Sequence, residues 1–162
     1  MNNASVIRIE NADIRFKNFS GAEGQFNPAG RRNFCVLFDE QQAEELMAAG
    51  WNIRMLRPQD EGDAPQPYMQ VAVSFSNVPP KVVLITSRGK TQLDEETINM
   101  LDYAKFANVD LAISPYHWQV SGRSGVKAYL KTMYVTLEED EFESKYIDVP
   151  DSAVNSLTVH QA

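Results

Sequence analysis

Apolar and polar residues alternate over short stretches along most of the chain, a pattern that is typical of β-strands with one buried face. Many of these stretches are rich in β-branched and aromatic residues and end near Gly, Pro, Asn or Ser. Seven of them predict strands: 5–21 (with a break near Asn11), 31–38, 51–58, 68–76, 81–87, 109–120 and 125–137. The chain is therefore expected to be mainly β.

Two segments predict helices. Asp39 precedes the segment 40–49 and is followed three residues later by Gln42, which is the capping-box arrangement. Asp94 is expected to cap a second helix over 95–106. This order of elements fits an OB-type five-stranded Greek-key barrel, which carries a helix before its last two strands, with the first helix as an insertion. Another antiparallel β+α domain is the alternative.

The length of 162 residues fits one domain, 1–137, followed by an acidic tail, 138–162, that is expected to be mobile. No apolar run approaches the ~18 residues of a membrane span. The first residues have neither the basic nor the apolar region of a signal peptide. The single cysteine, Cys35, cannot form an internal disulfide, and it is expected to be a reduced core residue of a cytoplasmic protein.

The formal net charge of -7 is unevenly distributed. Residues 1–136 hold 14 Lys and Arg against 15 Asp and Glu, a difference of -1, and residues 137–162 hold one Lys against seven acids, a difference of -6. The acids of the first part gather in the predicted helices and one loop, which leaves the predicted strands net basic. An anionic ligand is therefore not excluded, because the local field matters more than the sum.

The last two predicted strands form a hairpin that is rich in aromatic and cationic residues. A turn centred on Gly122–Arg123 gives one face the pairs Trp118 with Lys127, Tyr116 with Tyr129, and Ser114 with Lys131. The opposite face, which is expected to pack on the core, carries Ile113, Pro115, His117, Ala128, Leu130 and Thr132. Directly opposed residues share a side, so the first face would be an aromatic and cationic platform. The turn centre is an assumption, and a shift by one residue would exchange the faces.

Such a platform suits single-stranded nucleic acid, because exposed bases stack on aromatic rings and phosphates attract Lys and Arg. In an OB-fold this hairpin and the loop between strands 1 and 2 grip oligonucleotides, and basic residues flank both here. The expected stacking residues are Tyr116, Trp118, Tyr129 and Phe19. The expected phosphate contacts are Arg15, Lys17, Arg31, Arg32, Arg123, Lys127 and Lys131. Taken singly, such residues are more often ordinary core or solvated strand residues.

Catalytic and metal chemistry find little support in the sequence. The segment 88–91, Arg-Gly-Lys-Thr, follows a strand as a phosphate-binding loop does, but Leu84 stands where that loop needs a glycine. The two histidines, His117 and His160, are far apart and predict no metal site. Paired carboxylates occur only in the acidic helices and loops. We therefore expect no enzyme, no metal and no cofactor.

The acidic tail carries Phe142 and Tyr146 and has two interpretations. It is either a solubilising extension or a mimic of single-stranded DNA. Such a mimic would compete for the cationic groove and be released toward partner proteins when DNA binds.

Three long stretches resemble phage-encoded single-stranded DNA-binding proteins: IRFKNFSG…RRNFCVLFD…GWNIRMLRP, PPKVVLITSRGKTQLDEETINMLD and NVDLAISPYHWQVSGRSGVKAYLKTMYVTLEEDE. The resemblance spans about residues 5–146 and contains no short signature. It implies an OB-fold core, a role in replication or recombination in the host cytoplasm, and cooperation with a polymerase, helicase or recombinase. In one departure, such proteins often end in an acidic run closed by an aromatic residue, whereas this chain ends SLTVHQA.

The alternative function is a phage protein–protein module, accessory or inhibitory, whose acidic helices and tail are the working surface. A DNA binder prefers single strands to duplex and loses affinity with salt, and a protein module does neither. A bare OB module often forms a homodimer to widen its footprint. The sequence leaves the oligomeric state, the site size and the choice between DNA and RNA open.

Overall fold

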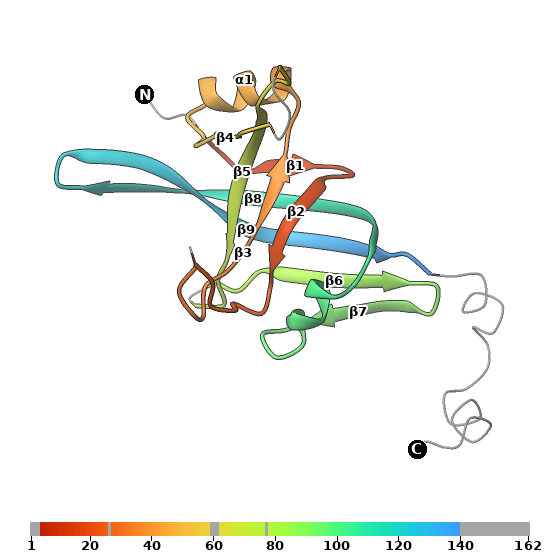
Figure 1. Ribbon diagram of the computed structural model, residues 1–162. Helices are drawn as coiled ribbons and strands as arrows, with labels where there is room; N and C mark the ends of the chain where they lie inside the picture. The colour runs from red at the N-terminus through yellow and green to blue at the C-terminus, as the bar shows by residue number, and fades with distance from the viewer. Residues whose placement is uncertain (1–3, 26, 59–61, 77, 140–162) are drawn as a thin grey trace, which may run out of the picture.

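The computed structural model describes residues 4–25, 27–58, 62–76 and 78–139 (Figure 1). These residues form one mixed β-sheet, one α-helix and one short 3-10 helix. The strands are β1 (Ile7–Ile9), β2 (Asp13–Asn18), β3 (Arg32–Leu37), β4 (Arg54–Leu56), β5 (Gln66–Val73), β6 (Lys81–Thr86), β7 (Gly89–Leu93), β8 (Phe106–Val120) and β9 (Arg123–Leu137). The helices are α1 (Glu40–Ala48) and the 3-10 helix η1 (Ile98–Asp102). In this part of the chain no helix is long and apolar enough to span a membrane.

The strand β9 organises the sheet, because both of its edges are paired. Along one edge it forms an antiparallel ladder with β8 over residues 123–137. Along the other edge it pairs in parallel with β5 at residues 128–129 and then with β6 over 132–136. The sheet continues from β5 to β3 and β2, while β4 pairs with β5, β7 with β6, and β1 with β8. Figure 1 shows β3 and β5 crossing the β8–β9 hairpin, so the sheet curls into a half-barrel.

The core lies inside this curl and is formed by the apolar side of each strand. Phe34 and Val71, from β3 and β5, have no exposed surface. Ile113 of β8 and Met133 of β9 are buried as completely. Each such side chain contributes roughly 1.5–3 kcal/mol by leaving water. The opposite side of the sheet is left to polar and half-exposed residues, and the candidate site lies there.

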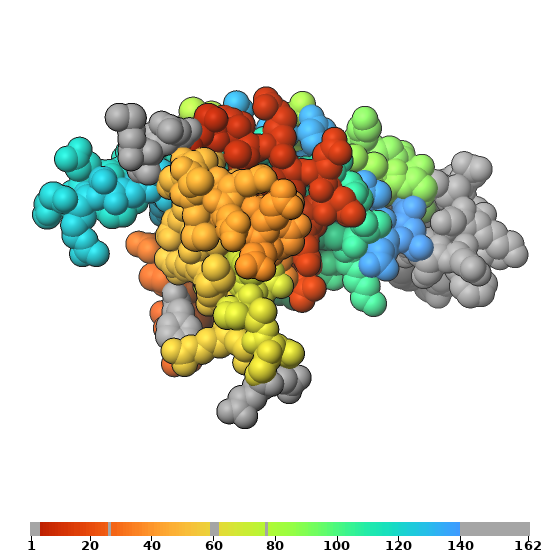
Figure 2. Space-filling model, turned by 90° about the horizontal axis from the view of Figure 1, so that it is seen from above, coloured from red at the N-terminus to blue at the C-terminus, as the bar shows by residue number. Residues whose placement is uncertain are grey.

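The first predicted helix is confirmed as α1. The Asp39 carboxylate accepts a hydrogen bond from the Gln42 backbone N–H at 2.7 Å, and the Gln42 side chain accepts one from the Asp39 backbone N–H at 3.0 Å. This capping box satisfies two N–H groups that the helix itself leaves without partners. Figure 2 shows α1 on the outer surface, with the tip of the β8–β9 hairpin extending beyond the body of the molecule.

The second predicted helix, 95–106, is wrong. The Asp94 carboxylate accepts hydrogen bonds from two backbone N–H groups that follow it, both at 3.0 Å, but only the short η1 comes after this turn. The Asp102 carboxylate then accepts hydrogen bonds from the backbone of Phe19 at 2.6 Å and of Ser20 at 3.0 Å. The segment is therefore held by the start of the β2–β3 loop, a tertiary contact that ends the helix early.

The predicted count of seven strands is also wrong, because the described residues form nine. The alternation pattern misses β7, four of whose five residues are exposed and polar or glycine. It also merges β1 with β2, although it locates the break between them correctly. Asn11 stands at that break in the left-handed region, with a φ of 49°.

An irregularity in β2 reverses the predicted role of one aromatic residue. The pairing of β2 with β3 shifts between Arg15 and Asn18. Phe16 lies there with a φ of 55°, and its side chain is 63% exposed. Phe19 has no exposed surface and stacks on Phe34 with the ring centroids 5.3 Å apart. The prediction that Phe19 stacks on a base is therefore wrong, because the bulge turns this ring into the core.

We expect Phe19→Ala to lower the free energy of unfolding by about 3–5 kcal/mol, since it removes a fully buried ring and leaves a cavity. Phe16→Ala is the matched control, and its effect should stay within about 0.5 kcal/mol because Phe16 is exposed. Urea unfolding followed by circular dichroism measures both. Equal losses in the two variants would contradict the assignment of Phe19 to the core.

Candidate nucleic-acid interface

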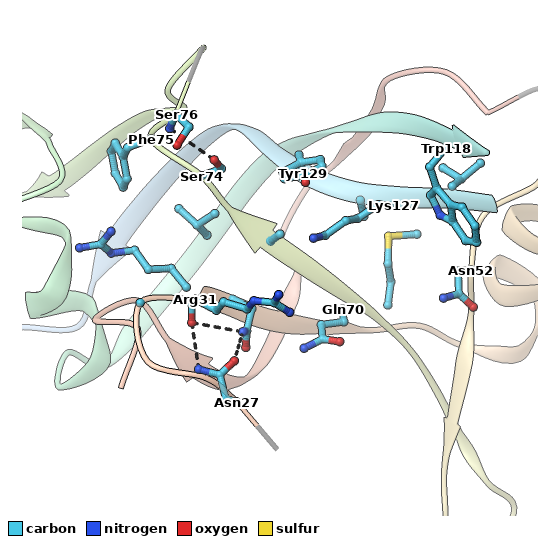
Figure 3. A pocket seen from close by; sticks show the side chains of 18 of the residues that line it. Asn27, Arg31, Asn52, Gln70, Ser74, Phe75, Ser76, Trp118, Lys127 and Tyr129 are labelled. Atoms are coloured by element: carbon cyan, nitrogen blue, oxygen red, sulfur yellow. Dashed lines mark hydrogen bonds between the residues drawn. The ribbon is translucent and has the colours of Figure 1, made fainter. Parts of the chain in front are cut away.

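A cleft of about 690 Å³ opens between the β2–β3 loop, the end of β5 and the β8–β9 hairpin. Its floor includes Asn33, Ala72 and Tyr129, which are paired across β3, β5 and β9 and therefore share one side of the sheet. Trp118 lies toward one end of the cleft and Phe75 toward the other (Figure 3).

The register of the hairpin differs by two residues from the predicted one. The turn is Ser121–Gly122, and both residues have positive φ (51° and 78°), as a type I′ turn requires. The observed pairs are Trp118 with Gly125, Tyr116 with Lys127, and Ser114 with Tyr129. Because side chains alternate with a period of two, this shift leaves every residue near the tip on its predicted face.

Two details of the predicted hairpin need correction. A bulge in the β8–β9 ladder leaves Lys131 without a pairing partner on β8, so it does not face Ser114. His117 is exposed instead of packing on the core, and its Nε2 lies 3.3 Å from the carbonyl oxygen of Ala4. Val126, its partner on β9, is buried on the same side, so the core ends at this pair.

The position of Trp118 depends on the glycine opposite to it. A Cβ atom on Gly125 would lie 2.7 Å from Cζ2 of the Trp118 indole and 3.0 Å from its Nε1. The indole therefore rests directly on the backbone of β9 at a place where only glycine leaves room for it. This contact supports one side of the ring while the residue lines the cleft (Figure 3).

Two tyrosines and a lysine form a contiguous group on the same face. The rings of Tyr116 and Tyr129 meet edge to face with centroids 6.1 Å apart. The Lys127 ammonium lies 5.1 Å from the centroid of the Tyr129 ring. Tyr116 is 57% exposed. The group therefore presents two accessible rings beside one cation.

Phe75 adds a third partly exposed ring to the cleft, and the sequence pattern does not predict this role. Figure 3 shows Phe75, Tyr129 and Trp118 spaced along the cleft. The alternation of Val71, Val73 and Phe75 predicts a core position, so no sequence signal separates Phe75 from its buried neighbours. The ring is half-buried and packs against the core, and the Arg32 guanidinium lies 5.4 Å from its centroid.

The cleft is cationic. Four of its lining residues are cations and one is an acid: Arg31, Arg32, Arg54 and Lys127 against Glu95. Arg32 is held in place, because its Nε donates to the Phe19 carbonyl oxygen at 2.7 Å and its Nη1 lies 3.3 Å from the Glu95 carboxylate. The side chains of Arg31, Arg54 and Lys127 form no ion pair with any described residue.

A network centred on Asn27 fixes the loop that carries Arg31. The Asn27 side-chain amide donates to the Arg31 carbonyl oxygen at 3.0 Å, and its oxygen accepts a hydrogen bond from the Asn33 side chain at 2.8 Å. The loop closes where Gly30 N–H donates to the Gly21 carbonyl oxygen at 2.8 Å. The backbone of Arg31 is therefore ordered while its side chain stays exposed.

The eleven residues predicted to bind nucleic acid separate into three groups. Five of them line the cleft together: Arg31, Arg32, Trp118, Lys127 and Tyr129. Four lie outside it on exposed surface: Arg15, Tyr116, Arg123 and Lys131. Two are engaged inside the fold: Lys17 and Phe19. Arg54 of the short strand β4 also lines the cleft, although the sequence pattern does not predict this.

Lys17 holds η1 against β2. Its ammonium donates to the carbonyl oxygens of Leu101 at 2.8 Å and Ala104 at 2.6 Å, and it lies 4.1 Å from the centroid of the Phe106 ring. Burial lowers the pKa of this ammonium, against the opposing effect of the Asp102 carboxylate. The structure therefore does not favour the predicted phosphate contact of Lys17, because two of the three ammonium donors already bind carbonyl oxygens of the fold.

Arg15 and Cys35 lie side by side on the cleft side of the sheet. Arg15 pairs with Cys35, and Cys35 with Gln70, which lines the cleft. Cys35 is a free, buried thiol as expected, and burial raises its pKa. Arg15 is exposed, and its Nε lies 3.0 Å from the Asp13 carboxylate. Within the described part of the chain, no group of three or more His, Cys, Asp or Glu could hold a metal ion.

Comparison with known proteins assigns the chain to a family. A family model described as "Putative phage ssDNA-binding domain" matches residues 2–162. The chain therefore belongs to this family, and the resemblance noted from the sequence is confirmed. The chain has no match among curated proteins.

Solved structures of the single-stranded DNA-binding protein from bacteriophage Enc34 share this fold. The protein in complex with ssDNA is 11% identical with a TM-score of 0.52, and the match covers 85% of this chain and 89% of that chain. A second structure of the same protein is 10% identical with a TM-score of 0.51, and the match covers 92% and 90%. At such low identity the likeness shows the fold alone.

Replacing Gly125 should displace the Trp118 indole. In a Trp51→Phe background, where Trp118 is the only tryptophan, we expect Gly125→Ala to shift the fluorescence emission to longer wavelength, because the ring leaves the backbone of β9 for water. Gly24→Ala is the control, since a Cβ atom there would meet nothing within 4 Å. An unchanged spectrum in Gly125→Ala would contradict the proposed contact.

Proposed function

We propose that this chain binds single-stranded DNA along the cleft without sequence preference. The observation that carries the proposal is the cleft itself, in which three partly exposed aromatic residues are spaced along a cationic surface, while the fourth lining aromatic residue, Trp51, is buried (Figure 3). Trp118, Tyr129 and Phe75 would stack on bases, and each stack is worth roughly 1–3 kcal/mol. Arg31, Arg54 and Lys127 would meet phosphates and release their counterions.

This arrangement favours a single strand over a duplex. Stacking on a protein side chain needs a base with a free face, and the bases of a duplex are stacked on each other. It also favours tolerance of sequence, because every base has a π-face and every nucleotide carries a phosphate. The amides of Asn27 and Asn33, which could read base edges, are hydrogen-bonded within the loop.

The proposal extends to an OB-type architecture. The curled sheet places the β2–β3 loop and the β8–β9 hairpin on opposite sides of the cleft. These correspond to the two loops with which OB-folds grip oligonucleotides. In support, the Enc34 protein, which shares the fold, has been solved in complex with ssDNA.

The biological role that follows is protection of exposed single strands during phage DNA replication or recombination, in the cytoplasm of the host. Binding of this kind needs no catalytic group and no cofactor. Residues 1–137 would form the binding domain, and the acidic tail, 138–162, would contact replication or recombination proteins. All of this tail beyond Glu139 lies outside the described residues. A homodimer would widen the footprint on DNA.

Titration with oligo(dT) tests the binding directly. In the Trp51→Phe background, we expect the fluorescence of Trp118 to be quenched when the oligonucleotide binds, because a base stacks on the indole. The logarithm of the affinity should fall linearly with the logarithm of the salt concentration. Duplex DNA of equal length is the control and should bind more weakly. No binding even at low salt would refute the proposal and favour the protein–protein alternative.

Lys127→Ala should weaken the binding of oligo(dT), since the variant removes a cation from the cleft. The slope of log affinity against log salt should become shallower by about 0.7, the value for one lost contact with a single strand. Lys105→Ala is the matched control, because Lys105 is exposed but does not line the cleft. If both lysine variants change the slope equally, the effect is one of total charge, and the cleft has no special role.

A further inference from the structure

The side of the sheet that forms the cleft continues beyond it along β8 and β9. Ser114 pairs with Tyr129, and Ala112 pairs with Thr132. Ser114 and Ala112 are two residues apart on β8 and face the same side. Thr132 therefore faces the same side as Tyr129, although the bulge at Lys131 separates them along β9.

At the level of Ala112 and Thr132, one residue from each of four strands lies in a single row across the sheet. The row is Arg8 of β1, Ala112 of β8, Thr132 of β9 and Lys81 of β6. We call it the β1–β6 row. It spans three inter-strand spacings, or about 14 Å between the outer Cα atoms. Arg8 and Lys81 are exposed at its two ends, and the residues between them have short side chains.

We propose that the β1–β6 row is a second subsite for the DNA strand, which leaves the cleft past Tyr129 and crosses the row. This inference rests on the proposed function of the cleft. Lys131 stands between the two subsites, where the bulge leaves it exposed. Tyr134, the next residue on this side of β9 after Thr132, offers a further ring, and the Lys81 ammonium lies 5.8 Å from its centroid.

The charges around the row indicate where the subsite ends. Arg8, Lys81 and Lys131 are its cations. Two acids lie just beyond the row. Asp110 pairs with Tyr134 one level further along β8 and accepts a hydrogen bond from the Asn11 backbone N–H at 2.9 Å. Glu10 is exposed and directly follows β1. Complementary charge thus extends from the cleft over the row and stops there. A polyanion that continues from the cleft is the occupant that fits this distribution.

Oligonucleotide length separates the two subsites experimentally. The double variant Arg8→Ala/Lys81→Ala should bind an oligo(dT) of about 5 nucleotides as the wild type does, because the cleft alone holds it. It should bind one of about 16 nucleotides more weakly, with a salt slope shallower by about 1.4 for two lost contacts. Arg57→Ala, an exposed arginine outside the cleft and the row, is the control. A single variant, Tyr134→Leu, should likewise weaken only the longer oligonucleotide.

Each outcome has one meaning. Unchanged affinity of the double variant for the longer oligonucleotide overturns the second subsite and leaves the cleft proposal intact. An equal loss for both lengths also overturns it, because Arg8 and Lys81 would then act on the cleft itself. If the wild type binds neither oligonucleotide, the proposed function fails first. Thermal unfolding of each variant verifies that these exposed substitutions leave the fold intact.

Discussion

The double pairing of β9 is the constraint on which the rest of the structure depends. One edge of β9 pairs with β8 along its whole length. The other edge pairs with β5 before Lys131 and with β6 after it. Buried backbone groups must find partners, so this division fixes where β5 joins the sheet. It thereby sets Ala72 beside Tyr129 and forms the floor of the cleft. It also places the cleft and the β1–β6 row on one continuous side of the sheet.

The sequence correctly predicts the features that depend on the two-residue period of side chains along a β-strand. It identifies the strands of the hairpin, and it assigns Trp118, Tyr116, Tyr129 and Lys127 to one face although it misplaces the turn by a full residue. Near the tip this error changes no face, because a shift of the pairing by two residues leaves each side chain on the same side of the sheet. A slip by one position would have reversed every assignment. The sequence thus predicts the face on which a residue lies more securely than the residue with which it pairs. The capping box of α1 is also predicted correctly, because it depends only on residues close together in the sequence.

Sequence reasoning fails where distant residues decide the local structure. The bulge in β2 buries Phe19 in the core and exposes Phe16 to solvent, and the local sequence pattern does not predict this bulge. The helix after Asp94 ends early because the Asp102 carboxylate binds backbone N–H groups more than eighty residues away. The role of Lys17 also depends on distant residues, since its ammonium donates hydrogen bonds to carbonyl oxygens around η1. Two members of the cleft are not predicted. Arg54 lies in the short strand β4 and Phe75 lies two residues beyond the end of β5, and neither local pattern distinguishes them from their neighbours.

The distribution of charge explains how an acidic chain can present a cationic surface. Salt screens exposed charges beyond about 8–10 Å, so the acids that line the cleft decide its field more than distant ones do. Among the described residues, Glu95 is the one acid that lines it. Glu95 acts directly, because it lies 3.3 Å from Arg32 inside the cleft. A phosphate at Arg32 would have to displace this carboxylate, whereas a phosphate at Arg31 or Arg54 would displace no acid among the described residues. Among the described residues, Glu95 is therefore the acid that would compete directly with an anion in the cleft, whatever the net charge of -7.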